Sequence, residues 1–529
     1  MKAKFKLRVV RAASMAVMLT GSMLTLGLAQ AQTQGGTLVA VVQPEPPLLM
    51  SGINQQGPTL YVAGKIYQGL LTYTADLQPQ PSLAKSWTIS DDGLVYTFKL
   101  QEGVKWHDGK PFSAADVVFT VDEFLRETQP RIRTLISKYI DTVTALDEST
   151  VEFKLKSPFA PFIYAFEAGS IPILPKHLYA GTNFKTNPAN QTPIGTGPFK
   201  FKEWKRGSYI KLERNPDYWK PDLPYLDEVI FRVVPDAASR AVAFEKGDVQ
   251  VLRGGDVDNV DVERLRALPD TEYSLKGWEM YSPHAYMIMN MRNPPFDNVK
   301  IRQAVMYALD RQFIVDNILF GLGKVATGPI ASTTLLYDAD VPKYEHNLKK
   351  AKALIKESGV DLSKTPVKML PLPYGTSWDR IAEYTKQSLE QVGFRVTTEP
   401  VSDAGSWFTR VSNWDFDLSF NYAFQYGDPG LGVSRLYLSS NIVKGTHTAN
   451  VQNYVNPKAD ELMTAGDAAV ALEDRQKYYS EAQKLLVEEV ANGYLFEIEN
   501  PTLYHSSVHN LIDSAVGVSD SFDNVYIEK

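Results

Sequence analysis

The alternation of apolar and polar residues predicts strands and helices along most of the chain. Residues 94–100 place Leu, Tyr, Phe and Leu on one face at period two, and residues 151–155 repeat this pattern. Such alternation is typical of half-buried strands. Residues 117–125 instead carry apolar side chains at helical spacing, after Ser113 and Asp116, a pair typical of a capping box. This region therefore combines strands with a capped helix.

The second half of the chain shows the same mixture. Helical spacing predicts helices over residues 297–309, 349–357 and 379–392, and Gly359 and Gly393 end the last two. A strand is predicted over residues 394–397. Alternating helices and strands in a chain of this length favour open α/β sheets. No repeat and no Pro-rich or Gly-rich linker marks a domain boundary.

The first 31 residues have the three-part layout of a secretory signal. Five basic residues precede an uncharged stretch over residues 12–28, and Ala29-Gln30-Ala31 follows. We expect a signal peptide over residues 1–31, with cleavage after Ala31. The alternative is a membrane anchor, but the apolar core is short for a span of about 20 residues. Removing the five basic residues changes the formal charge from −6 to −11.

Composition excludes several classes of function. The 529 residues allow two to four domains, and 44% hydrophobic with 22% charged residues argues against disorder and coiled coil. The absence of cysteine excludes a disulfide, a thiolate metal site, a Cys nucleophile and a lipid anchor on Cys. The acidic balance argues against binding nucleic acid. We therefore expect an exported protein without a lipid anchor.

Motifs for catalysis or metal binding are weak. His107 and Asp108 are adjacent, and adjacent side chains rarely point at one substrate atom. Residues 195–198 read Gly-Thr-Gly-Pro but lack the Gly-Lys-Ser/Thr of a phosphate loop, so a structural turn is expected. His505 and His509 have a metal-like spacing without helical support. The sequence predicts no catalytic residues, no metal site and no cofactor.

Several blocks of sequence carry a family resemblance. Residues 84–120 contain Ser-Asp-Asp-Gly, Trp-His-Asp-Gly-Lys-Pro-Phe and Ala-Asp-Val-Val-Phe. Further blocks follow in order at residues 193–199, 214–219, 244–249, 295–297 and 302–311. Together they closely resemble the extracytoplasmic solute-binding proteins of ABC importers, in the peptide/nickel/opine class (bacterial family 5). The resemblance covers nearly the whole chain after residue 31.

This resemblance implies an α/β fold, a two-lobed clamp of the periplasmic-binding-protein type (class II) with an extra subdomain in the first lobe. It places lobe I at residues 32–283 plus 498–529, the subdomain at about 61–193, and lobe II at 284–497. A solute held by both lobes would favour the closed form. The partners implied are that solute and the permease subunits of an importer in the inner membrane. The family expectation is a periplasmic monomer that makes and breaks no bonds.

The candidate ligand-binding residues come from three segments that match the family's cleft, residues 54–59, 370–378 and 421–429. They are Gln56, Gly57, Tyr374, Trp378, Trp407, Gln425, Tyr426 and Asp428. Aromatic walls with a few polar groups are usual in small-molecule sites. For each aromatic the alternative is a place in the core, and for Asp428 it is a turn cap.

The same alignment shows a departure from dipeptide-binding relatives. They hold the free amine with an Asp and the free carboxylate with an Arg, at the positions of Gln425 and Leu372 here. A buried zwitterion without opposite charges is costly, so a free dipeptide is disfavoured. Arg380 or Arg410 remain alternative cations.

The leading prediction is a periplasmic binding protein for peptides or similarly sized organic solutes. An oligosaccharide or an opine-like ligand fits Gln425 and the aromatics at least as well. A secreted hydrolase is the alternative from a different class, but no nucleophile–base pattern supports it. The same clamp could also present its ligand to a sensor.

Overall fold

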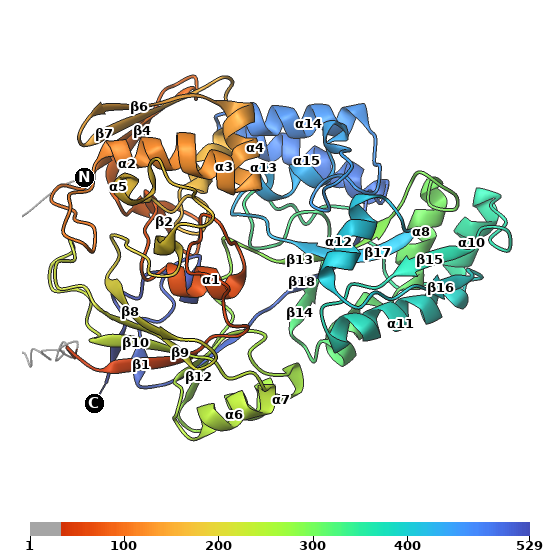
Figure 1. Ribbon diagram of the computed structural model, residues 1–529. Coiled ribbons are helices and arrows are strands. Elements are labelled where there is room, and N and C mark those ends of the chain that lie inside the picture. The colour runs from red at the N-terminus through yellow and green to blue at the C-terminus, as the bar shows by residue number, and fades with distance from the viewer. Residues whose placement is uncertain (1–32, 529) are drawn as a thin grey trace, which may run out of the picture. The chain divides into compact units, whose positions relative to one another are not determined.

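The computed structural model describes residues 33–528, and the predicted signal peptide lies outside them. Two large mixed sheets, each with its own helices, organise the described chain (Figure 1). We call them the first and the second sheet. Among residues 33–528, no helix has the length and apolar character needed to cross a bilayer.

The first sheet joins distant parts of the sequence. Its seven strands, in spatial order, are β12 (Thr271–Ser274), β19 (Thr502–His505), β11 (Val251–Leu252), β1 (Thr37–Val41), β10 (Glu228–Arg232), β9 (Tyr209–Arg214) and β8 (Phe199–Lys205). β1 pairs in parallel with β10 and β11, whereas β19 comes from near the C-terminus and pairs antiparallel with its neighbours. The associated helices are α1 (Gly57–Ala63), α6 (Ala237–Glu245) and α7 (Asn259–Arg266).

A smaller antiparallel sheet follows α1 in the sequence. It contains β4 (Ala84–Ile89), β5 (Val95–Leu100), β7 (Thr150–Leu155) and β6 (Ile140–Asp147), and the short strands β2 (Leu71–Tyr73) and β3 (Pro79–Pro81) pair separately. The helices of this region are α2 (Ala114–Phe119), α3 (Arg126–Thr128), α4 (Pro130–Tyr139) and α5 (Lys176–Tyr179). The predicted strands at 94–100 and 151–155 are confirmed as β5 and β7. The capping box of Ser113 and Asp116 begins α2 as predicted.

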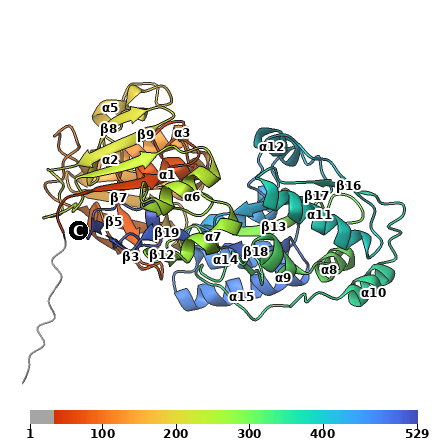
Figure 2. The same cartoon turned by 90° about the horizontal axis from the view of Figure 1, so that it is seen from below.

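The second sheet contains six strands. In spatial order they are β14 (Gly323–Val325), β18 (Gly493–Ile498), β13 (His284–Met289), β17 (Leu418–Ala423), β15 (Val367–Leu370) and β16 (Val396–Thr398). Its main helices are α8 (Val299–Ala308), α10 (Leu348–Ser358), α11 (Thr376–Glu390), α12 (Ala404–Ser412), α14 (Pro457–Ala468) and α15 (Leu472–Glu488). α8 packs on α10 (Figure 2), and α14 packs on α15. The lobe and subdomain boundaries drawn from the sequence stay predictions.

Helix ends depart from the sequence predictions where a cap was not recognised. α8 begins at Val299 because the Asn298 side chain accepts a hydrogen bond from the Lys300 N–H, so the predicted start at 297 was early. α11 begins at Thr376, ahead of the predicted 379, directly after Gly375 at φ +95°. α10 ends as predicted, before Gly359 in the left-handed region at φ +70°.

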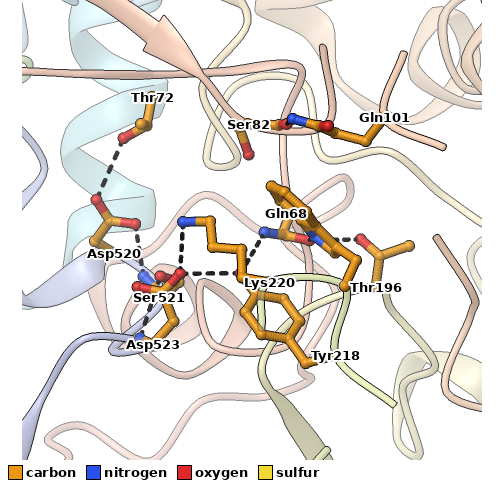
Figure 3. Close-up of polar contacts among 11 residues, drawn as sticks. Gln68, Thr72, Ser82, Gln101, Thr196, Tyr218, Lys220, Asp520, Ser521 and Asp523 are labelled. Atoms are coloured by element: carbon orange, nitrogen blue, oxygen red, sulfur yellow. Dashed lines mark hydrogen bonds and ion pairs between the residues drawn. The ribbon is translucent and has the colours of Figure 1, made fainter. Parts of the chain in front are cut away.

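Two of the family blocks meet on one buried glutamine. Gln68 donates a hydrogen bond to the Tyr218 hydroxyl over 3.1 Å, and that hydroxyl donates to Asp523 over 3.0 Å. Lys220 pairs with the same carboxylate at 2.7 Å (Figure 3). The Oε1 atom of Gln68 accepts from Thr196 over 3.1 Å. This network ties the C-terminal segment to residues 196–220, which explains polar residues in a buried place.

The glycines of the 193–199 block serve close packing. A Cβ atom at Gly195 would lie 1.9 Å from the Ile66 carbonyl oxygen, and one at Gly197 would lie 2.5 Å from that of Lys65. The His107 ring binds the same loop, with Nε2 2.9 Å from the Gly197 oxygen and Nδ1 accepting the Gly195 N–H over 3.2 Å. Residues 196–198 form a bend, so the segment has a structural role as predicted, and His107 supports it.

Candidate solute-binding site

A cavity of about 410 Å³ is lined by segments that lie far apart in the sequence. From the part that precedes the second sheet come Gln55, Gln129, Pro130 and Arg131. From the second sheet and its loops come Tyr286, Tyr374, Phe408, Asn421, Tyr422, Ala423, Phe424, Tyr426, Arg435, Leu436, His447 and Thr448. The volume falls within the roughly 300–1,000 Å³ of small-molecule sites. We call this cavity the solute pocket.

Aromatic rings form one wall of the solute pocket. The end of β17 and the residues after it supply Tyr422 and Phe424, whose ring centres are 5.9 Å apart. Tyr374 meets Tyr422 edge-on at 6.0 Å, and Trp378 stacks behind Tyr422 at 6.3 Å. Tyr374 is 39% exposed, whereas Trp378 is only 8% exposed. Tyr374 therefore offers a free face, while Trp378 supports the wall from the core.

Tyr426 is held in an unusual backbone conformation. Its φ angle is +55°, a value uncommon outside glycine, and Gly427 follows at +74°. The Arg131 guanidinium lies over the Tyr426 ring, 3.8 Å from its centre. This contact joins the first turn of α4 to the loop after β17 and is a cation–π interaction.

His447 and Phe408 form another wall, with their rings stacked 4.1 Å apart. Burial lowers the pKa of His447 to about 4, and the positive charge of Arg435 acts in the same direction. The imidazole is therefore neutral at pH 7 and offers one hydrogen-bond donor and one acceptor.

Gln425 does not line the pocket, and both ends of its side-chain amide bind the protein. Only 2% exposed, its Nε2 donates to the Pro329 carbonyl and its Oε1 accepts the Ala331 N–H, each over 3.0 Å. The side chain fixes the loop at residues 329–331. Ligand contact by Gln425 stays a prediction, and in this structure its hydrogen bonds are made with the protein.

Replacing Gln425 with glutamate is expected to destabilise the protein by about 1–3 kcal/mol at neutral pH. The carboxylate keeps the acceptor for Ala331 but loses the donor to Pro329, which leaves that carbonyl unpaired beside a buried charge. Urea unfolding measures the effect, with Tyr374→Phe as the control variant. Tyr374 is exposed on the pocket wall, so this control should unfold like the wild type. Equal stability of Gln425→Glu and the wild type would contradict the structural role.

Asp428 is completely buried in a two-pronged ion pair. Arg475 Nη1 lies 2.7 Å from Oδ2, and Nη2 lies 2.9 Å from Oδ1. The Asp428 carboxylate also accepts the Gly430 N–H and caps α13 (Pro429–Gly432). The predicted turn-capping role is thus confirmed. Ligand contact by Asp428 stays a prediction, and this carboxylate does not line the solute pocket.

The other sequence candidates lie around the pocket. Trp407 is completely buried on α12, and its Nε1 donates to Ser419 over 3.1 Å. Gln56 and Gly57 are exposed at the start of α1, beside Gln55, which lines the pocket. Their ligand contacts stay predictions.

The alternative cations named from the sequence do not line the solute pocket. Arg410 pairs with Glu399 at 2.6 Å and with Asp415 at 2.9 Å. Arg380 is exposed on α11. Leu372, at the position of the family's carboxylate-binding Arg, is completely buried in the core.

Sequence reasoning missed the two arginines and the histidine of the pocket. Arg131 follows Pro130 at the start of α4, and Arg435 lies in a short 3₁₀ turn, Ser434–Leu436. No periodicity or motif distinguishes them from the other basic residues. Within residues 33–528, no group of three or more His, Cys, Asp or Glu side chains is arranged to hold a metal.

Comparison with known proteins identifies the family. Residues 78–444 match the model of bacterial extracellular solute-binding proteins, family 5. The chain belongs to this family. The match confirms the resemblance drawn from the sequence blocks, and family 5 consists of binding proteins that serve ABC importers.

Relatives of this family 5 protein extend over most of its length. The oligopeptide-binding protein AppA of Bacillus subtilis is 33% identical over 481 residues, covering 85% of this chain and 84% of AppA. The solved structure of DppA from Helicobacter pylori, an ABC transporter-associated periplasmic binding protein in complex with the peptide STSA, shares 27% identity with a TM-score of 0.79. The match covers 94% of this chain and 99% of the DppA chain.

A third relative binds a different kind of molecule. AgaA from A. tumefaciens R10, solved in complex with agropinic acid, shares 26% identity with this chain at a TM-score of 0.79. The match covers 93% of this chain and 99% of the AgaA chain. These structures confirm the predicted two-lobed fold of the periplasmic-binding-protein type. We accordingly call the part with the first sheet the first lobe and the part with the second sheet the second lobe. Following the prediction from the sequence, we count the smaller antiparallel sheet and its helices, α4 included, with the first lobe.

Proposed function

We propose that this protein captures a peptide or a similarly sized organic solute outside the cytoplasm and delivers it to the permease of an ABC importer. The observation that carries the proposal is the solute pocket, lined by the start of α4 and by the second lobe and walled by aromatic rings. Relatives named for oligopeptides and solved with a peptide support this solute class. In this proposal the protein acts as a monomer in the periplasm after loss of residues 1–31, and it makes and breaks no bonds.

The pocket gives a physical reason for capture. A solute that contacts α4 of the first lobe and the loops after β17 of the second lobe gains contacts only when both are close together. Its differential affinity for that arrangement would drive closure. The permease would then recognise the closed form.

An opine-like solute is the second candidate, and the charge of the pocket favours it. Among the described residues that line the pocket, two are arginines and none is Asp or Glu. A dipeptide's free ammonium group would lack a counter-charge there. The relative AgaA was solved with agropinic acid. An oligosaccharide would use the aromatic faces but would leave the arginines unused.

Thermal-shift screening of the ligand-free protein tests the function. The panel contains dipeptides, longer peptides, opines, neutral oligosaccharides and nickel. A true ligand should stabilise the protein by about 2.7 kcal/mol at a hundredfold excess over its dissociation constant. Tyr374→Ala should weaken that ligand while leaving the unliganded protein nearly unchanged, because this ring is half exposed on the wall.

Two outcomes of the screen would contradict parts of the proposal. A panel in which no peptide, opine or sugar raises the melting temperature would contradict solute capture. Strong stabilisation by zwitterionic dipeptides without any by opines would contradict the argument from the charge of the pocket.

A further inference from the structure

Arg131, on α4, and Arg435, in the second lobe, both lie close to a single ring of the solute pocket. Arg131 lies in the first turn of α4, which begins after Gln129 accepts the Ile132 N–H and caps the helix. Its guanidinium carbon is 3.8 Å from the centre of the Tyr426 ring, and that of Arg435 is 5.8 Å from the same centre. Both side chains are partly buried.

Most donors of these two guanidinium groups have no partner within the described chain. Arg131 donates from Nη2 to the Ser170 hydroxyl over 2.7 Å, and Arg435 donates from Nε to the Gly432 carbonyl over 3.2 Å. Neither forms an ion pair with an Asp or Glu of residues 33–528 at 4.0 Å or less. A guanidinium carries five N–H donors, so each arginine keeps unused donors at the pocket.

The charges near the pair offset its positive charge only in part. Glu167 is 3% exposed and does not line the pocket, and its Oε2 accepts the Gly169 N–H. Burial raises the pKa of Glu167, and the positive charge of Arg131 opposes this rise. Burial lowers the pKa of Arg435, Tyr426 opposes this, and the positive charge of Arg131 lowers it further. His447 is neutral at pH 7. Two like charges therefore line one cavity, and each disfavours the charged form of the other.

We propose that Arg131 and Arg435 bind an oxyanion of the solute between them, and that the solute carries this anionic group on an apolar or aromatic body. The inference rests on the proposed function and names its ligand class. An oxyanion would satisfy the unused donors with charge-assisted hydrogen bonds. The N-terminal end of α4 adds a favourable partial positive charge. The aromatic wall of Tyr374, Tyr422 and Phe424 would cover the body of the solute.

The placement of the arginines on different lobes gives the anion a second effect. Without the anion, Arg131 and Arg435 repel each other as the lobes approach. With the anion bound, each arginine has an opposite charge beside it, but only in the closed arrangement. The solute's charge therefore selects for closure as well as for binding.

Matched small probes test the inference without knowledge of the natural solute. 3-Phenylpropionate has a carboxylate on an aromatic body, and 3-phenylpropionamide is its neutral counterpart of nearly the same shape. Binding of each is measured by ligand-observed NMR at low and high salt. The acid should bind about tenfold or more tightly than the amide, and added salt should weaken only the acid. Phenyl phosphate, as a third probe, shows whether a carboxylate or a phosphate is preferred.

Variants locate the effect. Arg435→Gln and Arg131→Gln should each reduce affinity for the acid about tenfold and leave the amide unchanged. Arg410→Gln is the matched control, because Arg410 pairs with Glu399 and Asp415 outside the pocket. Circular dichroism checks the fold of each variant, and the comparison of acid with amide on the wild type does not depend on any variant.

The outcomes separate this inference from the proposed function. Equal affinity for acid and amide, or no detectable binding of the acid, would overturn the oxyanion site. In that case solute capture still stands if neutral or C-terminally amidated peptides stabilise the protein in the thermal-shift screen. Unchanged acid affinity in folded Arg435→Gln would also overturn it.

Discussion

Replacing Arg475 with methionine is expected to destabilise the protein by about 3–5 kcal/mol. The guanidinium is 3% exposed and holds both oxygens of Asp428, which is not exposed at all. Methionine fills part of the space but leaves a buried carboxylate without its counter-charge. The cost is far larger than the attraction of a surface pair, because the desolvation of Asp428 is then uncompensated.

The same helix provides the control for this variant. Lys484 on α15 pairs with Asp340 at 2.8 Å, but its side chain is 46% exposed and that of Asp340 is 89% exposed. Lys484→Met is expected to change stability by less than about 1 kcal/mol. Urea unfolding followed by circular dichroism compares the two variants. Similar losses for both would contradict a special role of the buried pair.

The second large effect is expected for Trp407→Ala, with a loss of about 3–5 kcal/mol. The Trp407 ring is completely buried in the core of the second lobe. Its Nε1 donates to the Ser419 hydroxyl, and that hydroxyl donates to the Leu370 carbonyl over 2.8 Å. Truncation therefore leaves a large cavity and removes a link between α12 and strands β15 and β17.

The adjacent residue separates stability from binding. Phe408 is partly buried and lines the solute pocket from the same helix. Phe408→Ala is expected to cost less stability than Trp407→Ala but to weaken the tightest ligand found in the screen. Unfolding curves and ligand titrations of both variants measure the two effects. If Trp407→Ala weakened ligand binding more than it lowered the free energy of unfolding, that result would contradict a purely structural role. It would support the ligand contact that the sequence predicts for Trp407.

Local patterns predicted the elements that depend on local interactions. Period-two alternation located β5 and β7, and the Ser113–Asp116 pair located the start of α2. Helix starts were misplaced where the deciding group was a single cap, such as Asn298. The family blocks were recognisable from the sequence, but their purpose was not. Only the structure shows that Gly195 and Gly197 allow the close approach of residues 65–66.

For the candidate site, too, the sequence predicted one part and only the structure shows the other. The sequence by itself determined the family, the two-lobed fold and the segments near the pocket, because these follow from ordered motifs and periodicity. The tertiary structure decided which side chains face the pocket. It engages Gln425 with residues 329–331 and brings Arg131 and Arg435 close to the Tyr426 ring. The Gln425 hydrogen bonds join residues 94 and 96 positions apart, and Arg131 precedes Tyr426 by about 300 positions. No local pattern encodes which distant groups the folded chain brings together.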